Sequence, residues 1–366
     1  MDSFKVEYKP LLLEEVIAES NKKLFNVVST FAGGGGSSLG YRLAGGNILA
    51  INEFVESARD TYRSNWRETK IYPSDIRELK GSTILNDLNL KEGELDILDG
   101  SPPCASFSLS GNREKDWGKE KKYSDKTQTT DDLFFEYARL IDEIKPKTFI
   151  AENVKGLLIG SAKNFFGSSQ LGLFGGHSDT IYHTLTNLGY KVYYKVLNAK
   201  NYGVPQSRER LIIVGVRNDI DIPFKYPKAN DYIFSLREAF EGLEHSKEEL
   251  EEVNIDRFAI YKEAIKLEEG GQSEKYFNLI KSNSKKPSGT LTQTAGSVGA
   301  ASIIHWDNRK FTVKEAKRIM SFPDDYILKG TYREKVERLG RAVPPLLMSA
   351  VAKQVYNLIL KKWENN

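Results

Sequence analysis

The residue best suited to covalent chemistry in this sequence is its only cysteine, Cys104, which follows two prolines in the run DGSPPCASFS (99–108). A thiolate is a nucleophile, and the prolines stiffen the backbone that delivers it, because each fixes φ near about −65°. The apolar run 95–98 predicts a buried strand that Gly100 and the prolines end. We therefore expect Cys104 at the carboxyl edge of an α/β sheet, where such proteins keep their ligands. A buried, inert thiol is the alternative.

A carboxylate and two arginines could act beside this cysteine. Glu152 follows the next predicted strand, residues 148–151, and a buried carboxyl group there could serve as a general acid. An ordinary charged residue at a strand end is the alternative. If residues 206–210 (QSRER) are extended, Gln206, Arg208 and Arg210 share one face, because strand side chains alternate. That cluster could grip a base or form a salt-bridged edge.

A glycine loop opens the first β-α unit of the chain. Residues 27–31 predict a strand, 33–36 a tight loop and 37–44 a helix. Glycines let the backbone approach a ligand closely, and the helix N-terminus offers free N–H groups to an anion. Tight turns also use glycine for its backbone freedom alone, so the loop by itself is weak evidence for a cofactor.

Side chains at two further strand ends extend this site. Glu53 follows the predicted strand 47–52 and lies 20 residues beyond Gly33, a spacing at which an acidic residue binds ribose hydroxyls. Asp75 and Ile76 follow the predicted strand 70–72 and could hold an adenine by its amino edge and its face. These residues together favour a cofactor that contains adenosine, whereas Glu53 alone could be a solvated charge.

The length of the chain and the alternation of its predicted strands and helices divide it into three parts. The alternation of strands and helices predicts a first catalytic and cofactor-binding part at 1–216, a smaller domain at 217–305, and a C-terminal part at 306–366 that returns to the first. Thr312 and Glu315 form a capping box for a helix in the last part. The long basic stretch 109–130 could close over a phosphate backbone, or be a solvated loop.

Composition limits the class of protein. The 366 residues carry 53 basic and 50 acidic side chains, a net charge of +3, which permits nucleic acid as a partner without requiring it. One cysteine excludes an intramolecular disulfide and a multi-cysteine zinc site, and we expect no metal. No signal peptide and no membrane-spanning stretch are apparent, so a soluble, monomeric, cytoplasmic protein is expected, associated with the nucleoid if bacterial.

Taken in chain order, these motifs resemble those of the DNA cytosine carbon-5 methyltransferases. The resemblance runs from about Asn26 to Ala352, and only the middle domain is unmatched. The blocks that carry it are FAGGGGSSLG (31–40), Glu53, Asp75, SPPCASFS (101–108), ENV (152–154), QSRER (206–210), Thr290 with Leu291, FTVKEAKRIMSFPDDY (311–326) and GRAVPP (340–345).

The resemblance implies a Rossmann-like methyltransferase sheet with helices on both faces, a target recognition domain, S-adenosylmethionine as cofactor and double-stranded DNA as partner. It implies cofactor contacts for Phe31, Ala32, Gly33, Gly35, Gly36, Glu53, Asp75, Ile76, Asp99, Pro103, Ala342 and Val343. It implies DNA contacts for Ser108, Arg113, Thr290 and Leu291. A restriction endonuclease is a possible functional partner.

The implied reaction begins on a cytosine flipped out of the duplex, at a cost of a few kcal/mol. Cys104 adds to carbon-6, while Glu152 holds the ring nitrogen and amino group and supplies a proton. Arg208 lies on the side of the cytosine ring that carries its carbonyl group, and Gln206 and Arg210 complete the catalytic set. Carbon-5 then attacks the methyl group of the cofactor, and elimination restores the thiol.

The sequence departs from the family pattern at a few positions, which bear on cofactor contact, loop closure and rate. Ser29 replaces the acidic residue that usually opens the cofactor loop, and the other departures are Ala105, Asp131, Asp132 and Arg341. The alternatives are the same chemistry on tRNA, an exocyclic-amine methyltransferase, whose signature needs an aromatic residue in place of Cys104, a dehydrogenase, which would leave Cys104 without a use, and a DNA-binding relative without catalysis.

Overall fold

The centre of the molecule is a twisted seven-stranded sheet in the order β3-β2-β1-β4-β7-β9-β8. The computed structural model describes residues 6–102, 121–123, 126–128, 133–158 and 181–363. Within the sheet β9 runs antiparallel to both neighbours, and the other pairs are parallel. The strands are β1 (Phe25–Thr30), β2 (Gly46–Asn52), β3 (Lys70–Tyr72), β4 (Ile97–Gly100), β7 (Thr148–Val154), β8 (Tyr190–Asn198) and β9 (Glu209–Arg217).

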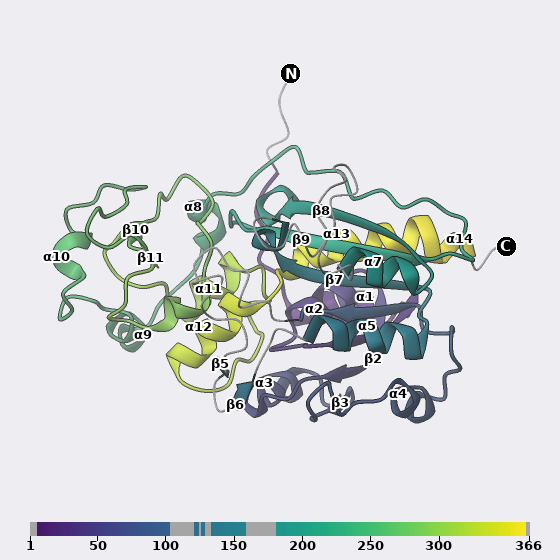
Figure 1. The fold of residues 1–366 in the computed structure, drawn as a ribbon. Helices are drawn as coiled ribbons and strands as arrows, with labels where there is room; N and C mark the ends of the chain where they lie inside the picture. Colours follow the sequence, from purple (N-terminus) through teal and green to yellow (C-terminus); the bar gives the residue numbers. More distant parts are fainter. Residues whose placement is uncertain (1–5, 103–120, 124–125, 129–132, 159–180, 364–366) are drawn as a thin grey trace, which may run out of the picture.

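Helices cover both faces of the sheet, because successive strand residues point to opposite sides (Figure 1). Val27 belongs to a hydrophobic cluster shared with one helical layer, and its neighbour Val28 belongs to a second cluster shared with the other. The first layer contains α1 (Leu13–Ser20), α2 (Gly36–Leu43), α3 (Glu56–Asn65) and α13 (Pro345–Val355), and the second contains α4 (Gly81–Leu88), α5 (Leu133–Ile144) and α7 (Ile181–Asn187). This arrangement confirms the predicted α/β methyltransferase class.

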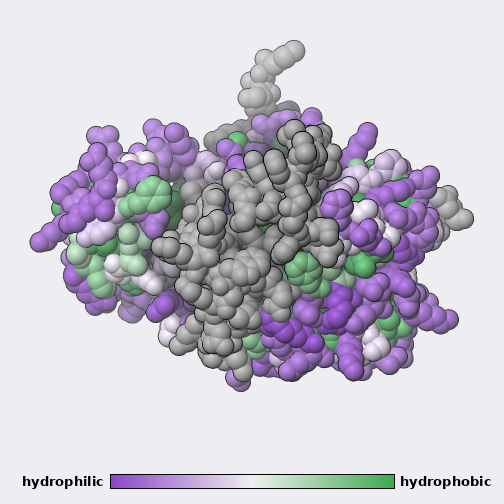
Figure 2. Space-filling model, in the orientation of Figure 1, coloured by the Kyte–Doolittle hydropathy of each residue, from purple (hydrophilic) through white to green (hydrophobic). Residues whose placement is uncertain are grey.

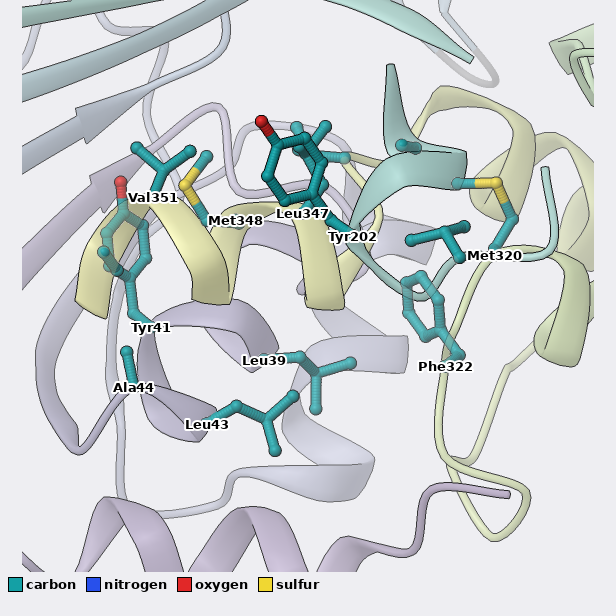
Figure 3. Close-up of a cluster of buried hydrophobic side chains, with 14 of the residues drawn as sticks. Leu39, Tyr41, Leu43, Ala44, Tyr202, Met320, Phe322, Leu347, Met348 and Val351 are labelled. Carbon is teal, nitrogen blue, oxygen red and sulfur yellow. The ribbon is translucent and has the colours of Figure 1, made fainter. Parts of the chain in front are cut away.

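The C-terminal part packs back on the first part, as the apolar face of its last helix predicts. Helix α2 packs directly on α13, where a Cβ on Gly40 would lie 2.5 Å from the Cβ of Met348. Leu39 and Leu43 of α2 and Leu347, Met348 and Val351 of α13 belong to one buried cluster (Figure 3). The helix continues through η6 (Tyr356–Leu360) and α14 (Lys361–Trp363), and it is preceded by α11 (Val313–Ile319) and α12 (Tyr332–Arg341). The last helix thereby fixes the position of the segment just before it, residues 340–344, above the sheet.

Residues 236–305 form a smaller body beside the sheet, whereas residues 218–235 still run along the sheet, where Ile220 and Phe224 pack in the main cluster (Figure 1). It contains α8 (Leu236–Phe240), α9 (Lys247–Glu252), α10 (Tyr261–Ala264), β10 (Ile280–Lys281), η5 (Gln293–Gly296) and β11 (Ile303–Ile304). A small core of its own includes Ile255, Leu279 and Ile304, but Leu236 and Leu291 join the main cluster. On the face shown in Figure 2, polar side chains predominate on the described surface, with small hydrophobic patches among them.

Several element boundaries differ from the sequence prediction. Phe31 lies outside β1, and β4 begins and ends two residues later than expected, so Asp99 is part of the strand. β7 continues to Val154 instead of ending at residue 151, because β9 pairs with it as far as Arg210. The predicted Thr312–Glu315 capping box is confirmed, with the Glu315 N–H donating to Thr312 Oγ1 at 3.2 Å.

Candidate active site

One edge of the sheet gathers the predicted site residues. The chain leaves β1 for β2 on one side, while β4 pairs with β1 on the other, so β1 and β4 meet at a topological switch point. The carboxyl ends of β1 to β4 and β7 lie along this edge. The antiparallel strand β9 brings its amino end, and not its carboxyl end, to the same edge.

The loop after β1 is a tight turn. Phe31 and Gly33 both have φ near 54°, in the left-handed region, and Gly35 has φ 94°. The Gly35 N–H donates to the carbonyl of Ala32 at 2.9 Å and closes the turn. A glycine is favoured at 33 and 35 because this conformation strains other residues.

At Gly36 the constraint is space. A Cβ atom there would lie 2.5 Å from the carbonyl oxygen of Val343 and 2.9 Å from the Cβ of Ala342. The segment between α12 and α13 therefore rests directly on the start of α2. Ala342 and Val343, which the family resemblance assigns to the cofactor site, do lie against the predicted cofactor loop.

Glu53 follows β2 and reaches back to the same loop. Its carboxylate accepts from the N–H of Gly33 at 2.7 Å and from that of Val55 at 2.8 Å. Burial raises the pKa of Glu53, and these two N–H donors oppose the rise. A carboxylate has about four acceptor positions, so Glu53 keeps acceptors for other donors such as ribose hydroxyls.

Asp75 and Ile76 are placed differently from one another. Asp75 forms an ion pair with Arg77 at 3.0 Å and is partly exposed. Ile76 is only 2% exposed and packs in the hydrophobic cluster with α4 and α5. The structure therefore places Asp75 at the surface of the edge and Ile76 in the core beneath it.

The predicted acid lies in a buried ion pair. Arg210 Nε is 2.8 Å from Glu152 Oε1, and the two side chains are only 14% and 11% exposed. Arg210 pairs across the strands with Val154, two residues from Glu152, so the pair is a diagonal contact on one face of the sheet. Burial lowers the pKa of Arg210, and the carboxylate of Glu152 opposes that shift.

Arg208 is not the arginine that meets the acid. Its guanidinium donates to the carbonyls of Leu291, Gly340 and Ala342 at 3.0, 2.9 and 3.0 Å, and the residue is 2% exposed. The expected place of Arg208 on the carbonyl side of a bound base is thus not the place that the structure gives it. Sequence alone could not separate the two arginines, because both fit a period of two.

Asn153 is a site residue that the sequence reasoning missed, although it stands next to Glu152 in the ENV block. Its Nδ2 donates to the carbonyl of Pro102 at 3.3 Å, and its Oδ1 accepts from the Val154 N–H at 2.8 Å. It ties the end of β7 to the chain two residues before Cys104. Four predicted site residues lie outside the described residues: Pro103, Cys104, Ser108 and Arg113.

Arg338 is a second missed residue, because it lies on α12, far along the sequence from the loop it contacts. Its side chain fills the space beside Gly34, where a Cβ would lie 2.6 Å from Arg338 Cγ. Its Nη2 donates to Ser57 Oγ at 2.7 Å, and Arg338 and Glu53 attract each other electrostatically. The arginine supports the loop and its carboxylate from the side of α12.

Comparison with known proteins identifies the family. The model of the C-5 cytosine-specific DNA methylases matches residues 25–357. The type II methyltransferase M.Eco47II of Escherichia coli is 32% identical, over 93% of this chain and 81% of its own. The type II methyltransferase M1.HphI of Haemophilus parahaemolyticus is 30% identical, over 90% of this chain and 86% of its own.

The chain belongs to the C-5 cytosine-specific DNA methylase family. It is an S-adenosylmethionine-dependent methyltransferase that acts on cytosine carbon-5 in DNA. A DNMT2 mutant from Spodoptera frugiperda shares its fold, with a TM-score of 0.64, 20% identity and coverage of 89% of this chain and 97% of that one.

In this methyltransferase Asp99 lies beneath the cofactor loop with both carboxylate oxygens engaged. Ser29 Oγ donates to Oδ2 at 2.5 Å, and Tyr41 OH donates to Oδ1 at 2.9 Å. Asp99 is 1% exposed, and burial raises its pKa to about 7, while the two hydroxyls lower it and Glu152 raises it. Asp99 therefore joins β4 to β1 and α2, and its contact with the cofactor stays a prediction.

The predicted DNA-contacting pair Thr290 and Leu291 divides between surface and core. Thr290 is exposed and its hydroxyl donates to the carbonyl of Ser207 at 3.0 Å. The side chain of Leu291 is 1% exposed, so it packs in the main cluster and offers no side-chain surface to DNA. Of the two residues, only Thr290 has its side chain at the surface.

Two further expectations concern metal and membrane. Among the described residues, no group of three or more His, Cys, Asp and Glu side chains could hold a metal ion. Contrary to expectation, the helical run Tyr332–Trp363 is long and apolar enough by composition to cross a membrane, but 61% of its most apolar window is buried inside the molecule. Its place against α2 in the core accounts for its composition.

Proposed function

We propose that Cys104, Glu152 and Arg210 carry out the methylation of a cytosine flipped out of a specific DNA sequence. The Cys104 thiolate adds to carbon-6, and the electron pair released into the ring makes carbon-5 a nucleophile. Glu152 binds the amino group and ring nitrogen, and supplies the proton that the nitrogen gains on addition. Arg210, in place of Arg208, donates to the carbonyl oxygen, because it is the arginine whose charge faces Glu152.

The observation that carries this proposal is the 2.8 Å contact between Arg210 and Glu152 at the edge where β4 delivers the Pro-Pro-Cys segment. A carboxylate beside a guanidinium offers an acceptor and donors in one plane, which is the pattern that the Watson–Crick edge of cytosine requires. Once carbon-5 has gained the methyl group, its proton passes to solvent, the ring nitrogen returns its proton to Glu152, and the Cys104 thiolate leaves carbon-6, which completes the cycle.

The residues at the edge fit S-adenosylmethionine. Glu53 has free acceptors for ribose hydroxyls, and Ser101 Oγ at the end of β4 is buried with no hydrogen-bond partner among the described residues. The backbone of Phe31 and of the glycine turn lies close to the switch point between β1 and β4. When bound there, the cofactor supplies the methyl group to carbon-5. The residues that would hold it are Glu53, Asp75, Ser101 and the loop 31–36.

The biological setting is part of the proposal. The curated relatives named above are type II methyltransferases, which supports a defined DNA sequence as target and a restriction endonuclease as functional partner. We propose a monomer in the cytoplasm, with residues 217–305 as the target recognition domain. The exposed Thr290 and the basic stretch 109–130 would contact the DNA backbone from two sides.

The proposal is tested by incubating the protein with S-adenosylmethionine and unmethylated plasmid, and measuring 5-methylcytosine by mass spectrometry. The wild type should produce it, Cys104→Ser should not, and bisulfite sequencing should map every product to one sequence. A parallel incubation with tRNA separates the two substrates. Product in tRNA alone, or a Cys104→Ser variant as active as the wild type, would overturn the proposal.

A further inference from the structure

Gln206 and Arg208 are polar side chains that the proposed reaction leaves without a task. Gln206 has no exposed surface and Arg208 is 2% exposed. Gln206 Nε2 donates to the carbonyl of Ile319 at 3.2 Å, while its Oε1 accepts from the N–H of Leu291 at 3.2 Å. The two side chains therefore hold Leu291 from both sides of its peptide, since Arg208 donates to its carbonyl.

The contacts around Leu291 extend along a whole segment. The Ser207 N–H donates to the carbonyl of Ser288 at 2.7 Å, and the Ser288 N–H donates to the carbonyl of Pro205 at 2.9 Å. Thr290 Oγ1 adds a bond to the carbonyl of Ser207 at 3.0 Å. Gln206 and Ser288 thus form an isolated parallel bridge, and the exposed Thr290 is fixed to the segment just before β9.

Arg208 also reaches the cofactor side of the molecule. Its Nη2 donates to the carbonyls of Gly340 and Ala342, at the end of α12. The next residues of this connection press on Gly36, where a Cβ would lie 2.5 Å from the Val343 carbonyl oxygen. A chain of direct contacts therefore runs from Thr290, through the QSR backbone and Arg208, to the start of α2.

The connection and the DNA-side segment also touch each other directly. A Cβ on Gly340 would lie 2.4 Å from the carbonyl oxygen of Thr292, so the backbones of α12 and η5 meet without a side chain between them. The guanidinium of Arg208 spans this junction. It forms no hydrogen bond or ion pair with a carboxylate among the described residues, and burial and the neighbouring Arg210 lower its pKa. Burial of a charge whose only partners are carbonyls costs free energy, which suggests that the arginine has a role at this junction.

We propose that Gln206 and Arg208 are positioning residues that fasten the DNA-side segment 288–291 and the cofactor-side connection 340–343 to the amino end of β9. They hold both segments in fixed register with Glu152 and Arg210, which lie on the strands beside them. Loss of Arg208 then loosens the DNA side and the cofactor side together, although Arg208 touches neither the base nor the cofactor. This inference rests on the proposed function for its DNA half only.

The test compares Arg208→Met and Arg208→Lys with wild type in two assays. Calorimetric titration with S-adenosylhomocysteine gives the dissociation constant on the cofactor side, and methyl transfer to unmethylated plasmid gives kcat and the KM for DNA. Arg208→Met leaves three carbonyls without a donor. We therefore expect the dissociation constant for S-adenosylhomocysteine and the KM for DNA each to rise by about tenfold. Arg208→Lys keeps one donor and should recover part of both losses.

Arg42→Met is the matched control, because Arg42 is another buried arginine, stacked 4.0 Å over the ring of Trp66 and away from the junction. When Arg42→Met lowers Tm as much as Arg208→Met does, it should leave the dissociation constant for S-adenosylhomocysteine and the KM for DNA within about twofold of wild type. If it reproduces both losses, the effect is general destabilisation and the inference is wrong.

The inference is also overturned if a folded Arg208→Met lowers kcat alone, because that pattern belongs to a residue in contact with the reacting base. If wild type fails to methylate plasmid, the proposed function fails. The titration with S-adenosylhomocysteine still tests the cofactor half of the inference in that case, since it needs no DNA.

Discussion

Replacement of Arg210 tests the proposed catalytic pair most directly. Removal of one member of a fully buried ion pair costs about 3–5 kcal/mol. The Arg210–Glu152 pair keeps 14% and 11% of its side-chain surface in contact with solvent, so we scale the loss of folding stability in Arg210→Met down to about 2–3 kcal/mol. We expect a loss of about the same size in transition-state stabilisation, because removal of one preorganised donor to a reacting group costs about 2.7–4 kcal/mol. At about 1.4 kcal/mol per factor of ten, kcat/KM should fall by roughly 30- to 150-fold.

The assay is single-turnover transfer of tritiated methyl to plasmid, and three variants separate the causes. Arg210→Lys keeps the charge but loses the planar fork, so its rate should lie between wild type and Arg210→Met. Glu152→Gln removes the proposed proton donor. In the double variant Arg210→Met with Glu152→Gln, the losses should add only in part, because the two residues hold each other as well as the base. Additive losses, or Arg210→Met within about twofold of wild type, would refute this reasoning.

Three further predictions concern the site and its support. Gly36→Ala should lower the free energy of unfolding, measured in urea, by about 1–3 kcal/mol and weaken S-adenosylhomocysteine binding, because the new Cβ meets a carbonyl oxygen at 2.5 Å. A Cβ at position 33 meets no atom within 4 Å, so Gly33→Asn should lower the free energy of unfolding without cofactor by less than about 1 kcal/mol. Asn153→Leu should reduce kcat by about five- to tenfold with little change in cofactor affinity, measured by plasmid methylation and calorimetry, since it frees the chain ahead of the cysteine. Burial lowers the pKa of His305 from 6.5 to about 3, so the unfolded chain gains the proton first as the pH falls. The contribution of His305 to the free energy of unfolding should therefore be about 2 kcal/mol smaller at pH 5 than at pH 7, measured in urea as the difference between wild type and His305→Gln at the two pH values.

The strands and their shared edge could be predicted because they follow from short-range patterns. Val27 and Val28 are both apolar, which marks a strand buried on both faces, and the structure sends them into two different clusters. Parallel strands then bring their carboxyl ends to one edge, so Glu53 and Glu152 were expected there without knowledge of any contact. The glycine turn was visible because its residue type is tied to its backbone conformation.

The division of labour between Arg208 and Arg210 could not be predicted, because it depends on parts of the chain far away. Both arginines satisfy the period of a strand, and both follow the same polar run. What buries one of them is the return of residues 288–291 and 340–342 to the amino end of β9, which no local pattern encodes. The same holds for Glu152, whose strand continues only because β9 pairs with it from the other direction.

The substitution at Ser29 is better explained by its neighbour than by its own position. Read along the sequence, Ser29 removes the acidic residue that the family resemblance implies at the opening of the cofactor loop. In the sheet, Ser29 is the register partner of Asp99, whose carboxylate accepts from the serine hydroxyl at 2.5 Å. A buried carboxylate is therefore present at this level of the sheet, on β4 instead of β1. Two carboxylates side by side here would repel each other in a site with little water, so a serine donor at position 29 is the partner that a buried Asp99 requires.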